Sequence, residues 1–201
     1  MVSRQNDRLI LASGSSARRA VLDGAGVPFT ARPSSVDEAA LKPTLAHLSP
    51  ADLALALAEA KALDVSRAEP DAWVLGADQT LELEGGSMDK AEDLAEGRAR
   101  LAAMAGRTHS LHAGLALAKG GQVIWTHLGR ADLTMRPLSD AFLDAYMADE
   151  GPQALSSVGV YRLEGPGAQL FERVEGDYFT ILGLPLWPLL AELRRIGIIG
   201  T

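Results

Sequence analysis

Cysteine does not occur in this sequence of 201 residues. Its absence excludes a disulfide framework, a thiolate nucleophile, a zinc knuckle and a cysteine-bound iron–sulfur cluster. Basic residues are also scarce, because 19 lysines and arginines stand against 26 aspartates and glutamates, which gives a net charge of -7. Binding a nucleic-acid backbone requires a surplus of positive charge, so we expect no nucleic-acid partner.

Long apolar runs are missing as well. Residues 9–12 form a run too short for the core of a signal peptide. Residues 181–191 contain two prolines and fall short of the ~20 residues that span a bilayer. We therefore expect a cytoplasmic protein without a membrane partner. The hydrophobic share of 47% is that of a folded chain, and the length predicts one domain over residues 1–201.

The spacing of apolar residues predicts strands and helices in alternation. Glycine pairs at positions 85–86 and 120–121 predict two hairpins. We expect further strands over residues 9–12, 29–32, 72–77, 158–163 and 170–174, helices over 17–22, 50–65, 93–105, 139–147 and 186–196, and a functional loop over 33–50. Because hairpins join antiparallel strands, the predicted fold is α/β with a mixed, twisted sheet, flanking helices and a cleft.

Several common catalytic motifs are absent. The sequence contains no phosphate-binding P-loop, and Phe29 stands where a dinucleotide-binding motif needs its third glycine. His109 and His112 fall on one predicted strand, where an odd separation places them on opposite faces. We therefore expect surface or capping histidines rather than joint metal ligands.

A serine-rich loop leads into the first predicted helix. Ser13, Ser15 and Ser16 supply hydroxyl donors, and Arg18 and Arg19 follow them. Helix N-terminal amides favour anions, so the loop is a candidate phosphate site. An ordinary helix cap with solvated arginines behind it explains the same residues equally well.

Two lysines extend this basic group. Lys61 lies four residues after Leu57 and eight after Leu53, so it continues an apolar stripe of its helix. An ammonium group on that side needs an anion, unless the side chain reaches along the apolar surface to water. Lys90 follows the first hairpin and, taken alone, is most often a surface lysine.

Three carboxylates stand near the ends of predicted elements. Asp78 follows the strand predicted over residues 72–77, and Asp78 and Glu38 could hold a divalent ion or activate a water molecule. Taken alone, an aspartate at this place more often forms a turn at the strand end than it acts as a base. Glu164 precedes a Gly-Pro-Gly sequence and could be a loop carboxylate or an acceptor of ligand hydrogen bonds.

Several ordered motifs of the sequence resemble the Maf family of nucleotide pyrophosphatases. They are Leu-Ala-Ser-Gly-Ser-Ser-Ala-Arg-Arg at 11–19, Val-Asp-Glu at 36–38, Gly-Ala-Asp-Gln at 76–79, Glu-Gly-Asp-Tyr at 175–178 and Gly-Leu-Pro-Leu at 183–186. Ala-Gly-Arg-Thr-His at 105–109 and Glu-Ala-Lys-Ala at 59–62 are also similar to family segments. The resemblance covers nearly the whole chain.

The resemblance implies hydrolysis of a nucleoside triphosphate to the monophosphate and pyrophosphate, with Mg²⁺ or Mn²⁺ as cofactor and a homodimer as the assembly. Asp78 falls on the family's proposed proton acceptor, and Asp78 and Glu38 would hold the metal. The residues implied in substrate binding are Ser13, Ser15, Arg18, Lys61 and Lys90.

Three positions bear on the base. Gln79 and Glu164 resemble the branch of 7-methyl-GTP pyrophosphatases rather than the dTTP/UTP branch. A carboxylate suits a cationic methylated guanine. Ala17 stands where one branch has arginine and the other tends to carry an aromatic residue. A dTTP/UTP enzyme, or a nucleotide-binding regulator of septum formation without turnover, are the alternatives.

Overall fold

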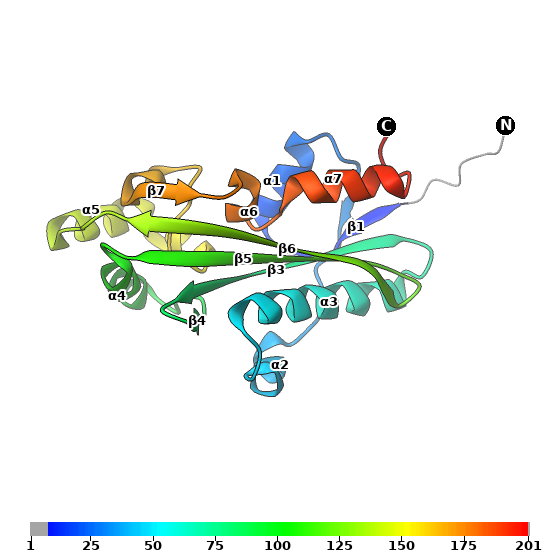
Figure 1. Ribbon diagram of the computed structural model, residues 1–201, viewed down its shortest axis with the longest axis horizontal. Coiled ribbons are helices and arrows are strands. Elements are labelled where there is room, and N and C mark those ends of the chain that lie inside the picture. Colours follow the sequence, from blue (N-terminus) through cyan, green and yellow to red (C-terminus); the bar gives the residue numbers. More distant parts are fainter. Residues whose placement is uncertain (1–7, 201) are drawn as a thin grey trace.

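A mixed sheet of seven strands forms the centre of the molecule in the computed structural model, which describes residues 8–200 (Figure 1). The strand order is β2-β1-β3-β5-β6-β7, with β4 paired to β3. The strands are β1 (Leu9–Leu11), β2 (Thr30–Ala31), β3 (Trp73–Leu83), β4 (Gly86–Met88), β5 (Thr108–Lys119), β6 (Gln122–Met135) and β7 (Phe171–Glu175). The predicted mixed α/β fold is therefore confirmed. Residues 1–7 and 201 of the predicted domain lie outside the described residues.

Strand β3 joins the parallel and antiparallel parts of the sheet. Its first residues pair in parallel with β1, and from Val74 to Glu82 it pairs antiparallel with β5. The prediction that this strand ends before Asp78 was wrong, because β3 continues without a break to Leu83. Asp78 consequently lies in the middle of β3 and pairs with Gly114 of β5.

Helices cover both faces of the sheet (Figure 1). Helix α3 packs on one face, and α1, α6 and α7 lie on the other. The helices are α1 (Ser16–Gly24), α2 (Glu38–Leu45), α3 (Pro50–Ala68), α4 (Leu94–Met104), α5 (Asp140–Glu150), α6 (Tyr178–Ile181) and α7 (Leu186–Arg195), with 3-10 helices at Gly151–Ser156 and Pro166–Leu170. Among the described residues, no helix is both long and apolar enough to cross a bilayer.

Helix α3 approaches the sheet closely because glycines face it. A Cβ atom on Gly114 would lie 2.6 Å from the Ala54 carbonyl oxygen, and one on Gly76 would lie 2.1 Å from that of Ala58. Side chains of even-numbered β3 residues point toward α3, and those of odd-numbered residues point toward α1, α6 and α7. This alternation fixes which side chains of β3 meet which helix.

Two further predictions of secondary structure were wrong. Residues 158–163 form turns rather than a strand, since Val160 has a positive φ of 61°. Part of the loop predicted over residues 33–50 is helix α2, which begins where the Asp37 side chain accepts a hydrogen bond from the Ala40 amide.

The two histidines lie on opposite faces of β5, as predicted, but neither is a surface residue. His109 is 1% exposed and its Nε2 lies 2.7 Å from the Tyr161 hydroxyl. His112 is 4% exposed and its Nε2 lies 2.7 Å from a carboxylate oxygen of Glu82. Both side chains are buried because each has a polar partner inside the fold.

Candidate active site

A cavity of about 810 Å³ opens beside the middle of β3. Its walls come from the serine-rich loop, α2, α3, the segment after β4 and the turns after Gly151–Ser156. It is lined by every residue to which the sequence analysis gave a catalytic, binding or specificity role: Ser13, Ser15, Ala17, Arg18, Glu38, Lys61, Asp78, Gln79, Lys90 and Glu164. Residues far apart in the sequence thus share one cavity, while their individual roles stay predictions.

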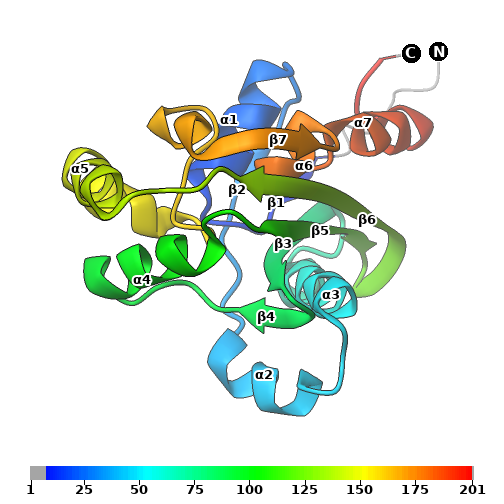
Figure 2. The same ribbon diagram turned by 60° about the vertical axis from the view of Figure 1, so that its left-hand side comes forward.

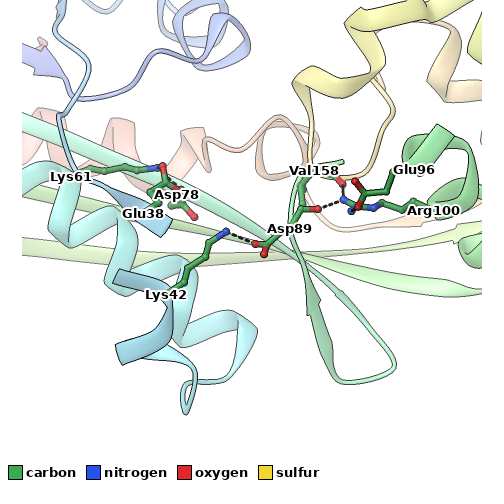
Figure 3. Close-up of polar contacts among 8 residues, drawn as sticks. All are labelled: Glu38, Lys42, Lys61, Asp78, Asp89, Glu96, Arg100 and Val158. Atoms are coloured by element: carbon green, nitrogen blue, oxygen red, sulfur yellow. Dashed lines mark hydrogen bonds and ion pairs between the residues drawn. The ribbon is translucent and has the colours of Figure 1, made fainter. Parts of the chain in front are cut away.

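Lys61 connects the two carboxylates at the centre of the cavity (Figure 3). Its Nζ lies 2.6 Å from Asp78 Oδ1 and 2.8 Å from Glu38 Oε1. Asp78 is an even-numbered residue of β3, so it points toward α3, which carries Lys61. Lys61 is only 9% exposed, and the alternative of an ammonium group in water was therefore wrong.

Burial raises the pKa of the Asp78 carboxyl above its ordinary value. The positive charges of Lys61 and Arg18 and the hydrogen bond from Lys61 lower this pKa, whereas the negative charge of Glu38 raises it. A carboxylate with a raised pKa is a stronger base than an exposed one. The arrangement can therefore accept a proton from a water molecule held in the cavity.

Arg18 fixes the serine-rich loop against β3. Its guanidinium group donates hydrogen bonds to the main-chain oxygens of Ala77 and Gly183, both at 2.9 Å, and to the Ser13 hydroxyl at 3.1 Å. Burial lowers its pKa, while the charges of Asp78 and Glu38 oppose that shift. Ser15 caps α1 by accepting from the Arg18 amide, so the predicted cap is correct, but Arg18 is not a solvated arginine.

The three specificity candidates differ in their surroundings. The Gln79 amide nitrogen donates to the main-chain oxygens of Thr180 and Ile181 at 3.0 and 3.1 Å, so this group is already bound within the protein. Glu164 is exposed and Ala17 is half-buried, and both line the cavity. Lys90, another lining residue, is exposed as well. Glu164 is consequently the specificity candidate most accessible to a ligand.

Arg100 is a structural residue of the site that the sequence analysis missed. Its side chain on α4 is buried and donates to the main-chain oxygens of Asp89 and, at 2.9 Å, of Val158 (Figure 3). Both acceptors belong to cavity walls: Asp89 precedes Lys90, and Val158 begins the turns that carry Glu164. One guanidinium group therefore joins two walls of the cavity.

Lys42 is a cavity residue that sequence reasoning also missed. It lies on α2, one turn after Glu38, and its ammonium group forms an ion pair with the Asp89 carboxylate (Figure 3). The side chains of Lys42 and Asp89 are 36% and 72% exposed. The signal in the sequence was weak, because a lysine in a polar segment is usually solvated.

Glu38 and Asp78 are the carboxylates that meet at the centre of the cavity. Across residues 8–200 no three His, Cys, Asp or Glu side chains form a group that could hold one. Mg²⁺ commonly takes one or two protein carboxylates together with water and substrate phosphates. Glu38 and Asp78, which meet at Lys61, fit a site of that kind and do not fit a closed protein cage.

The chain is similar to known proteins over nearly its whole length. The family described as Maf-like protein matches residues 8–196. The chain is 52% identical over 195 residues to a 7-methyl-GTP pyrophosphatase of Rhizobium meliloti (strain 1021), with 96% of this chain and 98% of that protein covered. With the same shares covered, it is 53% identical over 192 residues to a nucleoside triphosphate pyrophosphatase of Maricaulis maris (strain MCS10). It is 51% identical over 195 residues to a 7-methyl-GTP pyrophosphatase of Mesorhizobium japonicum, again with 96% and 98% covered.

Proposed function

The chain belongs to the Maf-like protein family, and we propose that it is a metal-dependent nucleoside triphosphate pyrophosphatase that prefers a 7-methylguanine base. It hydrolyses the linkage between the α- and β-phosphates and releases a nucleoside monophosphate and pyrophosphate. The names of the relatives support this reaction class. The observation that carries the proposal is the buried contact of 2.6 Å between Asp78 and Lys61, in a cavity lined by further cations.

Asp78 is the general base of the proposed mechanism. It takes a proton from water as the water oxygen bonds to the α-phosphorus, and the bridging oxygen leaves with the pyrophosphate. Arg18 and Lys61 hold positive charge beside Asp78, where it stabilises the negative charge that develops on the leaving pyrophosphate. Lys90 supplies a further cation at the exposed side of the cavity.

Glu38 and Asp78 would hold Mg²⁺ or Mn²⁺ together with phosphate oxygens of the substrate. Such an ion neutralises phosphate charge and orients the substrate. Lys61 keeps the two carboxylates near each other at contacts of 2.6 and 2.8 Å, so the protein part of the site is ordered by an ammonium group.

Glu164 supports the preference for a 7-methylguanine base. Its exposed carboxylate lines the cavity and can accept hydrogen bonds from the N–H donors of guanine while facing the positive charge of the methylated ring. Uracil and thymine present mainly carbonyl acceptors, which a carboxylate repels. Gln79 supports the site indirectly, because its side-chain nitrogen donates to the Thr180 main-chain oxygen and so connects β3 with α6.

The alternative is a nucleotide-binding regulator of septum formation that does not turn over its ligand. A binding protein has no need of a buried base with a raised pKa, and the Asp78–Lys61 contact therefore favours the enzyme. The cytoplasmic location, the homodimer and the lack of nucleic-acid or membrane partners stay predictions of the sequence.

Pyrophosphate release from the purified protein tests the proposal. The assay uses Mg²⁺, Mn²⁺ or a chelator, and a panel of 7-methyl-GTP, UTP, dTTP, 5-methyl-UTP and the common nucleoside triphosphates. We expect metal-dependent turnover that is fastest with 7-methyl-GTP. Binding without turnover of any nucleotide would support the regulator instead.

Two variants test the assigned roles. Asp78→Asn should keep the fold and lose most turnover, and near-normal activity would refute the base assignment. Glu164→Gln should shift preference toward pyrimidines, and an unchanged profile would count against the specificity argument. Thermal unfolding of both variants controls for loss of structure.

A further inference from the structure

Lys42 lines the cavity, and its ammonium group forms an ion pair with the exposed carboxylate of Asp89. We propose that Lys42 is a substrate-binding residue whose ammonium group leaves Asp89 and binds a phosphate oxygen when a nucleoside triphosphate enters the cavity. The inference rests on the proposed function, and it adds a residue to which neither the motifs nor the relatives assign a role.

Most cations of the cavity are already held by the protein. Arg18 donates to two main-chain oxygens and to Ser13. Lys61 lies between two carboxylates, and Arg162 forms two hydrogen bonds of 3.0 Å with the buried Glu150. Moving any of these groups toward a ligand would leave a buried acceptor or carboxylate without its partner.

Lys42 is different because its partner is a surface carboxylate. The Asp89 side chain is 72% exposed, so water can solvate it when the ion pair opens. Exposed ion pairs contribute little stability, whereas hydrogen bonds from an ammonium group to a phosphate are strong. Exchange of Asp89 for a phosphate oxygen is therefore favourable at Lys42.

Helix α2 is suited to this exchange. It buries none of its side chains, contains Pro43, and lies at the periphery of the molecule in both views (Figures 1 and 2). Lys42 follows Glu38 by one helical turn, so both side chains occupy one face of α2. A small movement of α2 can bring Lys42 to the substrate without disturbing a packed core.

The direction in which KM changes in two variants shows whether Lys42 binds the substrate or only holds α2 in place. If Lys42 binds phosphate, Lys42→Met should raise KM about tenfold with kcat changed less than about threefold, the loss expected of one charge-assisted hydrogen bond. Asp89→Asn releases Lys42 and should lower KM by about two- to fivefold, the range of an exposed ion pair. If the pair only tethers α2, both substitutions should raise KM.

A double variant tests whether Asp89 acts through Lys42. In the Lys42→Met background, Asp89→Asn should leave KM unchanged. A lowered KM in that background would show that Asp89 acts on the substrate directly, and it would overturn the inference. Lys42→Arg keeps the charge and should restore KM to within about threefold of the original protein.

Lys119→Met is the matched control. Lys119 lies over the Trp73 ring, 4.9 Å from its centroid, and does not line the cavity. Its replacement should leave KM unchanged. If the unsubstituted protein turns over no nucleotide, the proposed function is refuted. If it does turn over nucleotide but Lys42→Met leaves KM unchanged, only the inference about Lys42 is refuted.

Discussion

Replacing Lys61 with methionine tests the central ion pair most directly. Methionine keeps an unbranched apolar side chain of similar length but leaves Asp78 and Glu38 without their common ammonium group. Removing one partner of a buried ion pair costs about 3–5 kcal/mol. The Glu38 contact adds little, because its side chain is 41% exposed. We therefore expect the free energy of unfolding at neutral pH to fall by about 3 kcal/mol.

Protonation of Asp78 relieves part of this loss. Burial already raises the pKa of Asp78, and the charge and hydrogen bond of Lys61 oppose that rise. Without the charge and hydrogen bond of Lys61, the pKa of Asp78 should rise further in Lys61→Met. Because the base acts as a carboxylate, the acidic limb of kcat/KM should move to higher pH.

The stability of Lys61→Met should have the matching pH dependence. A carboxyl whose pKa is raised by folding destabilises the protein when ionised, and this effect vanishes as pH falls through that pKa toward the ordinary value of 3.8. The midpoint of thermal unfolding should fall by about 6–12 °C at neutral pH. It should fall less in acid.

The pH profile of kcat/KM and thermal unfolding in acidic and neutral buffer measure both effects. Lys119→Met controls for the general replacement of lysine by methionine. An acidic limb that stays in place would refute the argument that Lys61 governs the charge of Asp78. A loss of stability that is equal at both pH values would refute it as well.

Three other substitutions test the packing around the site. Gly114→Ala should lower stability by about 1–3 kcal/mol in urea unfolding, since its Cβ would meet the Ala54 carbonyl oxygen; Gly24→Ala, in open space, should not. Burial lowers the pKa of His109 to about 4, so stability should fall by up to about 3 kcal/mol between pH 6.5 and 4, and His109→Gln should abolish that slope. Arg100→Met removes the donor to the buried Val158 carbonyl oxygen and should cost about 1–3 kcal/mol; unchanged thermal unfolding would contradict this role.

The sequence was sufficient where local periodicity determines the environment of a side chain. Lys61 stood on the apolar stripe of a helix, which left either an anion or water as the partner of its ammonium group, and the Asp78 carboxylate meets it at 2.6 Å. The two hairpins and the serine cap of α1 were predicted for the same reason, because turn and cap residues act on their own backbone; the first turn lies one residue earlier than predicted, at Glu84 and Gly85.

Contacts made through the backbone of distant segments could not be predicted. Arg100 binds main-chain oxygens of Asp89 and Val158. Every residue has such an oxygen, so the sequence does not indicate which ones the guanidinium group will bind. The positive φ of Val160 likewise has no local signal, since valine normally favours strands. The buried position of His109 depends on Tyr161, a partner 52 residues away.

The two carboxylates of the cavity rest on parts of the fold that differ in how readily they open. Asp78 belongs to the hydrogen-bonded centre of the sheet, where amide hydrogen exchange requires opening of the most protected structure. Glu38 lies on a short helix without a buried side chain, where a local fluctuation is enough. Local opening of α2 can therefore displace Glu38 while the strand that carries Asp78 keeps its place, so amides of α2 should exchange with solvent much faster than those of β3.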